Sequence, residues 1–287
     1  MYKILAKKML TPGIVLMDIE APRVARSAMP GQFVIVRAHE KGERIPLTIC
    51  DYDVQKGTVT IVTQIVGASS RLICAKEAGD SLPDFVGPLG MASEFVHEPA
   101  EVLKKRRFLF LAGGLGAAPV YPQVKYLHQM GATVDVMVAA KSKDMLILTD
   151  EMRAVCHCLY LATDDGSEGY HGLITGLLKE HLTAGAHYDH AVAIGPMVMM
   201  KFVTLTTKEF NLPLIVSLNT IMVDGTGMCG ACRVSVAGKT KFACVDGPEF
   251  NAYDVDFDEA MRRQLMYRDM EIIADHKCKI GLGGKNE

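Results

Sequence analysis

The stretch RFLFLAGGLGAAPVYPQVKYLHQMG (107–131) decides the fold of this chain. It opens with a continuous apolar run that ends in glycines, and the segment after the glycines can form a helix. The apolar run recurs as VDVMVAA (134–140), LYLAT (159–163), HAVAIG (190–195) and PLIVSLNT (213–220), with helical candidates between most of these runs. Buried strands that alternate with helices predict a parallel, Rossmann-like α/β domain over residues 99–220, with PLIVSLNT as its last strand.

Residues 1–98 have a different pattern. Short β-type runs such as GQFVIVRAH (31–39) and TVTIVTQIV (58–66) alternate with turn signals such as the loop DFVGPLG (84–90). No convincing helical run separates the first strands, so these residues predict a small antiparallel β-barrel. The charged stretch EVLKKRR marks the boundary between the barrel and the α/β domain.

Residues 221–287 contain a cysteine loop with the spacing Asp224-x4-Cys229-x2-Cys232-x11-Cys244. A 2Fe–2S cluster needs four anionic ligands on a loop that wraps closely around it, and the plant-type ferredoxin arrangement has this x4–x2 spacing with cysteine in the first position. Glycines at 225, 227 and 230 allow tight turns and can aim backbone amides at the sulfurs. A short hairpin, RVSVAGKTKFACV, and a tail with one helix-like stretch, DEAMRRQLMYRDMEII, complete this small module.

Other metal chemistry is compatible with the same cysteine loop. Three thiolates and a carboxylate can bind zinc, and Cys229 with Cys232 forms a CxxC pair that could act as a redox dithiol. Asp224 before a glycine is also a good turn residue. The glycine-lined spacing is not typical of zinc ribbons, so we interpret the four residues as ligands of a 2Fe–2S cluster.

Three glycine-containing motifs lie where predicted strands of the α/β domain end. Glycines after a buried strand let a dinucleotide diphosphate approach the backbone at the start of the following helix. A tight strand–helix turn without a ligand explains the same residues. The candidates for nucleotide binding are Gly113, Gly114 and Gly116 before Pro119, then Gly195, Pro196 and Met197, and Asp164 after LYLAT.

Two polar motifs stand at strand ends of the predicted barrel. An arginine can pair with a diphosphate, a threonine can hydrogen-bond a flavin ring, and exposed amides can hold a phosphate, although ordinary turns have similar sequences. The candidate residues are Arg44, Pro46, Leu47 and Thr48 in one motif and Gly67, Ser69 and Ser70 in the other.

The composition excludes several classes of function. The chain has 287 residues and 49% hydrophobic residues, and its formal net charge of −2 gives no electrostatic case for binding nucleic acid or anionic lipid. Neither a signal peptide nor an apolar stretch long enough to span a membrane is evident, and we expect a cytoplasmic location. We expect Cys50 and the Cys156-His157-Cys158 cluster to be structural.

These motifs, with Gly87-Pro88-Leu89-Gly90, occur in the order found in the ferredoxin–NADP⁺ reductase superfamily. Within it, the whole chain resembles iron–sulfur flavoproteins related to the electron-transfer subunit of dihydroorotate dehydrogenase. Those relatives carry four cysteines in the loop. Asp224 followed by three cysteines and VDGPEF is instead similar to the small (alpha) subunits of NADH-dependent ferredoxin:NADP⁺ oxidoreductases, also called sulfide dehydrogenase subunits.

The resemblance implies a flavin-binding barrel, a nucleotide-binding domain and an iron–sulfur module, with FAD, NAD(H) and a 2Fe–2S cluster as cofactors. By position, the Arg44 motif would hold the flavin ring, the Gly67 motif its diphosphate and the Gly113 motif NAD(H). Lys141 and Lys143 could instead favour NADP(H), although a solvated loop explains them equally well.

The implied activity is electron transfer between a nicotinamide and the cluster, with flavin as the adapter between two-electron and one-electron chemistry. No general base or nucleophile is required, so we expect no catalytic side chain. The resemblance also implies a heterodimer with a larger subunit that contains flavin and 4Fe–4S clusters, bifurcates electrons and reaches ferredoxin. The alternatives are the electron-transfer subunit of dihydroorotate dehydrogenase and, from another class, a zinc-stapled binding or redox-sensing module without enzymatic activity.

Overall fold

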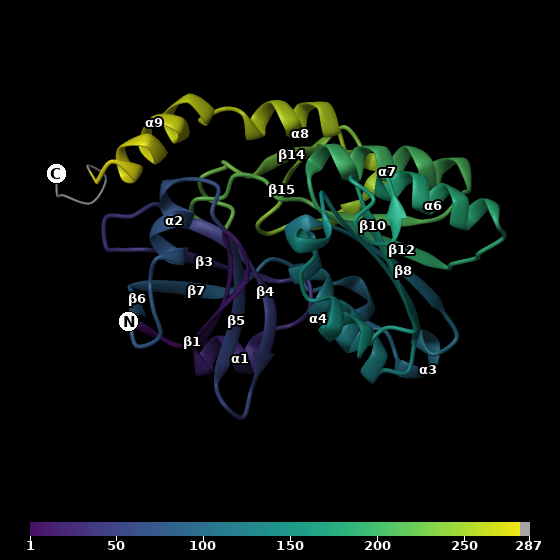
Figure 1. Cartoon of the computed structure of the whole chain (residues 1–287), viewed down its shortest axis with the longest axis horizontal. Coiled ribbons are helices and arrows are strands. Elements are labelled where there is room, and N and C mark those ends of the chain that lie inside the picture. Colours follow the sequence, from purple (N-terminus) through teal and green to yellow (C-terminus); the bar gives the residue numbers. More distant parts are fainter. Residues whose placement is uncertain (282–287) are drawn as a thin grey trace.

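The computed structural model describes residues 1–281. Residues 282–287, which were assigned from sequence to the third domain, lie outside this range. In the described chain, two seven-stranded sheets form separate layers that meet along one side, and a two-stranded hairpin lies above their junction (Figure 1). The helices at the C-terminal end, drawn in yellow, run across the top of both sheets.

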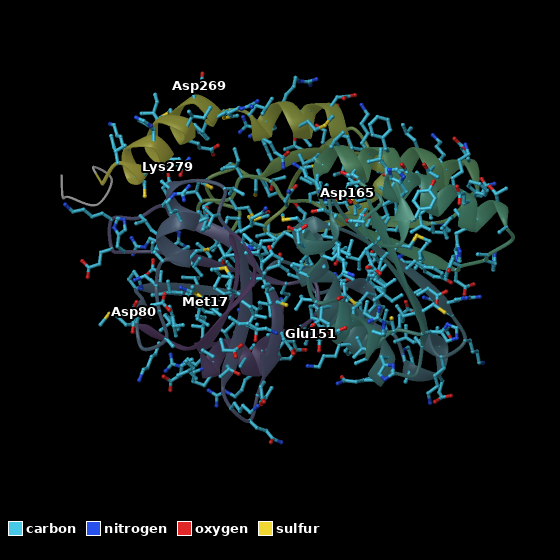
Figure 2. The ribbon with its side chains drawn as sticks, in the orientation of Figure 1. Met17, Asp80, Glu151, Asp165, Asp269 and Lys279 are labelled. Carbon is cyan, nitrogen blue, oxygen red and sulfur yellow. The ribbon has the colours of Figure 1, made fainter. Side chains whose placement is uncertain are left out.

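The first sheet is antiparallel throughout, with the strand order β6-β1-β2-β5-β4-β3-β7. Its strands are β1 (Tyr2–Thr11), β2 (Ile14–Glu20), β3 (Phe33–Arg37), β4 (Ile45–Asp53), β5 (Thr58–Gln64), β6 (Ser81–Leu82) and β7 (Asp84–Leu89). The two edge strands, β6 and β7, are separated by a single residue in the sequence. Strand β6 pairs with β1 at one end of the sheet, and β7 pairs with β3 at the other. The sheet is therefore nearly closed into the predicted barrel, and side chains such as Met17, labelled in Figure 2, fill its interior.

Two short helices interrupt the barrel, contrary to the sequence expectation that none would separate its strands. Helix α1 (Pro22–Ser27) follows β2, and α2 (Ala68–Cys74) follows β5. Proline is tolerated in the first turn of α1, because its missing N–H costs no hydrogen bond there. The helix is too short to give a clear periodic pattern in the sequence. Gly67 is the N-cap of α2, so the predicted Gly67–Ser70 motif is the cap and first turn of a helix.

The second sheet has the order β11-β10-β9-β8-β12-β13-β16. Its strands are β8 (Arg107–Gly113), β9 (Thr133–Ala140), β10 (Cys158–Thr163), β11 (Tyr170–His171), β12 (His190–Ile194), β13 (Leu214–Ser217) and β16 (Glu249–Asn251). All neighbours are parallel except β13 and β16. The chain moves outward from β8 through β9 to β10 and then returns to β12 on the other side of β8. The order therefore reverses between β8 and β12, which is where ligands bind in open α/β sheets.

Helices cover both faces of this sheet. Phe108 and Phe110 share a buried cluster with α4 (Ala117–Gln129) and α5 (Thr149–Arg153), whereas Leu109 and Leu111 share one with α6 (Ile174–Thr183) and α7 (Met197–Glu209). Successive strand residues thus point to opposite faces, as a doubly covered sheet requires. The remaining short helices are α3 (Ala100–Leu103), η1 (Glu94–His97), η2 (Gly114–Gly116), η3 (Lys143–Met145) and η4 (Ala252–Asp254). None of the helices within residues 1–281 is long and apolar enough to cross a membrane.

The C-terminal segment is tied to both sheets. It contains the predicted hairpin, β14 (Arg233–Val236) and β15 (Lys239–Phe242), and then β16, which pairs antiparallel with β13. PLIVSLNT therefore supplies the last parallel strand of the sheet but not its edge. The predicted single helix is wrong: α8 (Phe257–Gln264) and α9 (Arg268–Lys279) are separate, and α9 returns to the barrel, where Arg71 of α2 pairs with Asp275 at 3.0 Å.

Candidate functional site

The cysteine loop lies between β13 and the β14–β15 hairpin. Cys232 and Cys244 are each 2% exposed and their sulfurs are 3.2 Å apart, whereas Cys229 is exposed. The two buried thiols meet because the hairpin returns Cys244, just after β15, to the position of Cys232 just before β14. The Ala243 amide, which donates to the Cys232 carbonyl at 3.2 Å, closes this arrangement.

The three loop glycines adopt the backbone conformations of the tight turns that were expected from the sequence. Gly225, Gly227 and Gly230 have φ of 86°, 86° and 69°, a region that favours glycine. A Cβ on Gly225 would also lie 2.8 Å from a methyl group of Leu89 in the barrel. The loop can therefore turn tightly while its backbone rests directly on β7.

Backbone amides of this loop point at sulfur atoms. The amide of Ala231 is the main reason that the pKa of Cys229 lies below its usual range, and the amide of Asp224 adds to the effect. Burial raises the pKa of Cys244 to about 12, while the amide of Gly227 opposes this shift. Amides directed at thiolates stabilise negative charge around an iron–sulfur cluster. The donor set of three thiols and surrounding amides thus fits such a cluster.

Asp224 has a clear local role in this loop. Its carboxylate accepts hydrogen bonds from the amide of Thr226 at 2.9 Å and from the Thr226 hydroxyl group. These two donors hold the pKa of Asp224 below its usual range, the hydroxyl group contributing most. This is the turn geometry considered from sequence, and a ligand role for Asp224 stays a prediction.

Arg44 joins the barrel to the cysteine loop. Its guanidinium donates to the Val223 carbonyl at 2.8 Å and to the Asp224 carbonyl at 3.3 Å, and it forms an ion pair with Asp84 at 3.3 Å. Two motifs that are 180 residues apart in sequence therefore touch. No residue pattern predicts this contact, because backbone carbonyls accept from any arginine that the fold brings close. The predicted diphosphate contact of Arg44 stays a prediction.

The other barrel candidates lie beside Arg44. Pro46, Leu47 and Thr48 are in β4, opposite β3. Ser69 donates to Glu43, which brings the start of α2 next to the Arg44 motif. The Ser70 hydroxyl accepts from the Gly67 amide at 3.0 Å and stabilises the first turn of α2. The structure thus brings the two predicted flavin motifs together, with Ser70 engaged in capping.

The nucleotide candidates gather at the carboxyl ends of β8 and β12. A Cβ on Gly116 would lie 2.0 Å from the carbonyl oxygen of Ile194, and one on Gly113 would lie 2.2 Å from Met199 Sδ. Gly195 makes a similar approach to Met199, a residue that the sequence reasoning missed. Gly114, with φ of 53°, has open space where a Cβ would stand.

The remaining nucleotide candidates differ in position. Met197 is 4% exposed and belongs to the core beneath α7, and Pro196 is the residue just before that helix. Asp164 follows β10, beside Asp165 of Figure 2, and is exposed. Lys143 forms an ion pair with Glu168 at 2.8 Å, so one of the two lysines considered for a 2′-phosphate already has a carboxylate partner.

Comparison with known proteins identifies the family of this chain. Residues 219–256 match the family model for the iron–sulfur cluster binding domain of dihydroorotate dehydrogenase B. A Thermotoga maritima protein, described as a homolog of the electron transfer subunit of dihydroorotate dehydrogenase B (NAD(+)), is 45% identical over 256 residues, 89% of this chain and 88% of the relative. The chain belongs to this electron transfer subunit family. A Clostridium beijerinckii member, described as an uncharacterized protein in adh 3'region, is 58% identical and covers 94% of this chain and 92% of its own length.

A solved structure of the NADH-dependent reduced ferredoxin-NADP oxidoreductase, described with flavin-based electron bifurcation, has a TM-score of 0.89 and 41% identity to this family member, over 98% of both chains. A ferredoxin NADP+ reductase from Neisseria gonorrhoeae, with bound FAD and NADP, has a TM-score of 0.59 at 20% identity and covers 72% of this chain and 89% of its own. At that identity the second likeness shows the fold alone. The predicted combination of barrel, α/β domain and small iron–sulfur module is confirmed.

This family member also carries a polar group between barrel and α/β sheet that sequence reasoning missed. Glu249 on β16 accepts from the Ser93 hydroxyl at 3.0 Å and from the Gln123 side-chain amide at 2.9 Å. Burial raises the pKa of Glu249 to about 7, although both donors oppose the shift. Cys50 packs in an apolar cluster with residues of α4, as expected from sequence.

Proposed function

We propose that the chain is the electron-transfer subunit of a flavin-dependent oxidoreductase and moves electrons between NAD(H) and a 2Fe–2S cluster by way of FAD. The observation that carries the proposal is the contact between Arg44 and the cysteine loop, in a chain that matches an NADH-dependent ferredoxin-NADP oxidoreductase over 98% of its length. That contact ties the cluster loop directly to the predicted flavin motif of the barrel, as transfer between two redox centres requires.

Each cofactor has residues that fit it. Cys229, Cys232 and Cys244 would hold the cluster, with Asp224 as the predicted fourth ligand. The Arg44 and Gly67 motifs would hold FAD, and the open backbone at Gly114 would admit NAD(H) at the edge where β8 and β12 diverge. We propose NAD(H) as the nucleotide, because Lys143 is already paired with Glu168.

A flavin held by the Arg44 and Gly67 motifs would supply the conversion between two-electron hydride chemistry and one-electron transfer to an iron–sulfur cluster. The chain's own part is to position and to tune. The buried Cys232 and Cys244 keep water from one side of the cluster loop, whereas the exposed Cys229 lies toward the surface. This chemistry needs no general base, since no proton has to be removed from a carbon centre.

We further propose the three-part division into residues 1–98, 99–220 and 221–287 and a cytoplasmic heterodimer. The partner would be a larger subunit with flavin and 4Fe–4S clusters, which bifurcates electrons and reaches ferredoxin. The Thermotoga maritima relative is described as a homolog of an electron transfer subunit, which supports a partner of this kind. The exposed Cys229 also supports it, because the cluster would then have one side near the surface.

The test is anaerobic purification of the chain with whatever subunit binds it. We expect flavin absorbance, two iron atoms with labile sulfide in the cysteine loop, an EPR signal on reduction, and NADH oxidation with an artificial acceptor. Zinc in place of iron, without flavin, would refute the proposal and favour the zinc-stapled module. A dihydroorotate-oxidising partner would establish the alternative of a dihydroorotate dehydrogenase subunit.

A further inference from the structure

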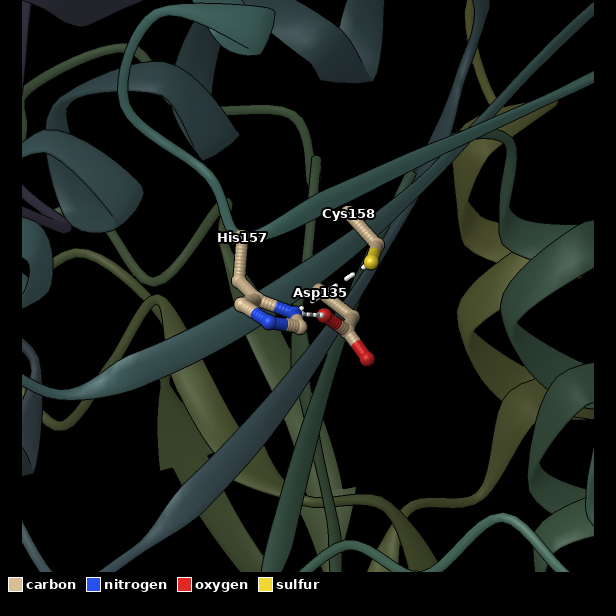
Figure 3. A group of neighbouring side chains, drawn as sticks. All are labelled: Asp135, His157 and Cys158. Carbon is tan, nitrogen blue, oxygen red and sulfur yellow. Dashed lines mark hydrogen bonds and ion pairs between the residues drawn. The ribbon is translucent and has the colours of Figure 1, made fainter.

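A second group of ligand-type side chains lies at the opposite edge of the α/β sheet, at the amino ends of β9 and β10. It consists of Asp135, His157 and Cys158, whose ligand atoms all lie within 4.8 Å of one another (Figure 3). In Figure 3, dashed lines join the carboxylate of Asp135 and the thiol of Cys158 to the same imidazole ring of His157. The group is far from the cysteine loop in sequence and shares no residue with it.

The sheet register brings the three together. Cys158 is the first residue of β10 and is directly paired with Asp135 of β9, so their side chains leave the same face of the sheet. The His157 amide donates to the Val134 carbonyl at 2.7 Å, which fixes the turn before β10 and holds the imidazole over the carboxylate. From sequence, His157 between two cysteines was expected to be structural because it lacked a further ligand. The fold supplies a further ligand-type side chain, Asp135, beside it.

The two oxygens of Asp135 have different surroundings. Asp135 Oδ2 accepts from Arg107 at 2.8 Å and from the Tyr188 hydroxyl at 2.7 Å. Asp135 Oδ1 faces His157 Nδ1 at 3.0 Å. Arg107 and Tyr188 therefore hold a fully buried carboxylate in place and leave Oδ1 directed at the imidazole, as an outer partner does for a metal-ligating carboxylate.

One ring nitrogen serves two electron-rich neighbours. His157 Nδ1 lies 3.0 Å from Asp135 Oδ1 and also 3.2 Å from Cys158 Sγ. A proton on Nδ1 can point well at only one of them, and without that proton the nitrogen faces a carboxylate that has no hydrogen to donate. A single cation bound by the nitrogen, the oxygen and the sulfur accepts a lone pair from each of the three atoms at once.

The spacing suits a small tetrahedral ion. Zinc–ligand lengths of about 2.0–2.3 Å place neighbouring ligand atoms about 3.4–3.6 Å apart. The two distances to His157 Nδ1, 3.0 Å from Asp135 Oδ1 and 3.2 Å from Cys158 Sγ, need to widen by only a few tenths of an ångström, and the carboxylate and the thiol lie within 4.8 Å of each other. The His157 side chain is 59% exposed, so an ion can enter from solvent and keep water as a fourth ligand.

We propose that Asp135, His157 and Cys158 form a second metal site, for a divalent cation of the zinc class. Thiolate, imidazole and carboxylate together favour zinc over magnesium or calcium, which prefer oxygen ligands. The ion links the turn before β10 to β9. It therefore stiffens the amino ends of these strands, opposite the carboxyl ends where the candidates for nucleotide binding lie.

The experiment uses the chain with its redox cofactors and partner, equilibrated with zinc in a chelator-buffered solution and then analysed for zinc and iron. Cys158→Ser and His157→Ala remove one ligand each at a site where the backbone pairing remains. Cys156→Ser is the matched control, since its thiol belongs to the same turn but not to the group. Equal iron in all samples shows that zinc has not replaced iron in the cysteine loop.

We expect one zinc per chain in the wild type and in Cys156→Ser, with affinity at least about tenfold lower in Cys158→Ser and His157→Ala. Zinc should also raise the Tm of the wild type and leave that of the two ligand variants unchanged. Zinc binding that is equal in all four proteins, or no zinc binding by the wild type, overturns the proposal.

Discussion

Replacement of Gly116 by alanine tests how the nucleotide edge is built. The new Cβ would stand 2.0 Å from the Ile194 carbonyl oxygen, whereas ordinary contact begins at 3.4 Å. The turn after β8 must therefore move by about 1.4 Å away from β12. Gly116 has φ of −58°, so backbone strain adds nothing and the whole effect is steric. Overpacking of this kind costs about 1–3 kcal/mol.

Two measurements follow from that displacement. The Tm should fall by roughly 2–8 °C, and kcat/KM for NADH with an artificial acceptor should fall up to about 100-fold, because a misplacement of about 1 Å can cost that much. A matched control is Gly176→Ala on α6, where the new Cβ approaches the Tyr170 hydroxyl at 2.6 Å, the end of a side chain that can move. Its Tm and kcat/KM should stay near those of the wild type.

Wild-type Tm and wild-type kcat/KM in Gly116→Ala would refute the reasoning that this glycine is required by the contact with Ile194. Equal losses in Gly176→Ala would refute it too, because they would show that any added methyl group in this domain has the same effect.

Three further predictions concern the cluster loop and the domain junction. Asp224→Cys should retain a 2Fe–2S cluster with a changed reduction potential, measured by redox titration; an unchanged potential would mean that Asp224 is only a turn residue. Arg44→Ala should speed the loss of iron to a chelator several-fold, because the Val223 and Asp224 carbonyls lose their charged donor. Glu249 should contribute a fall in the free energy of unfolding as pH rises from about 4.5 to 7, because the folded residue keeps a proton that the unfolded chain loses. Glu249→Gln should flatten that fall by roughly 1–3 kcal/mol, and identical pH profiles of the two proteins in chemical denaturation would contradict the assignment.

Local chemistry explains what could be predicted about the site. The glycines at 225, 227 and 230 were expected to allow tight turns, and all three have positive φ. The spacing of Cys229, Cys232 and Cys244 predicted that the thiols gather, and the hairpin brings the two buried sulfurs together. The Gly67 motif was less accurate, since its polar residues also start a helix that is too short to show periodicity.

The sequence by itself determined the order of the parts: a β-branched barrel segment, apolar strands that alternate with helices, and a cysteine loop. These are signals of local conformation and burial, which neighbouring residues encode. Only the tertiary structure decided that Arg44 holds the cysteine loop, that β16 extends the α/β sheet, and that Asp135 meets His157 and Cys158. Each of these contacts depends on strand register or on the packing of distant segments. Register and packing minimise the free energy of the whole chain, so no single stretch of sequence specifies them.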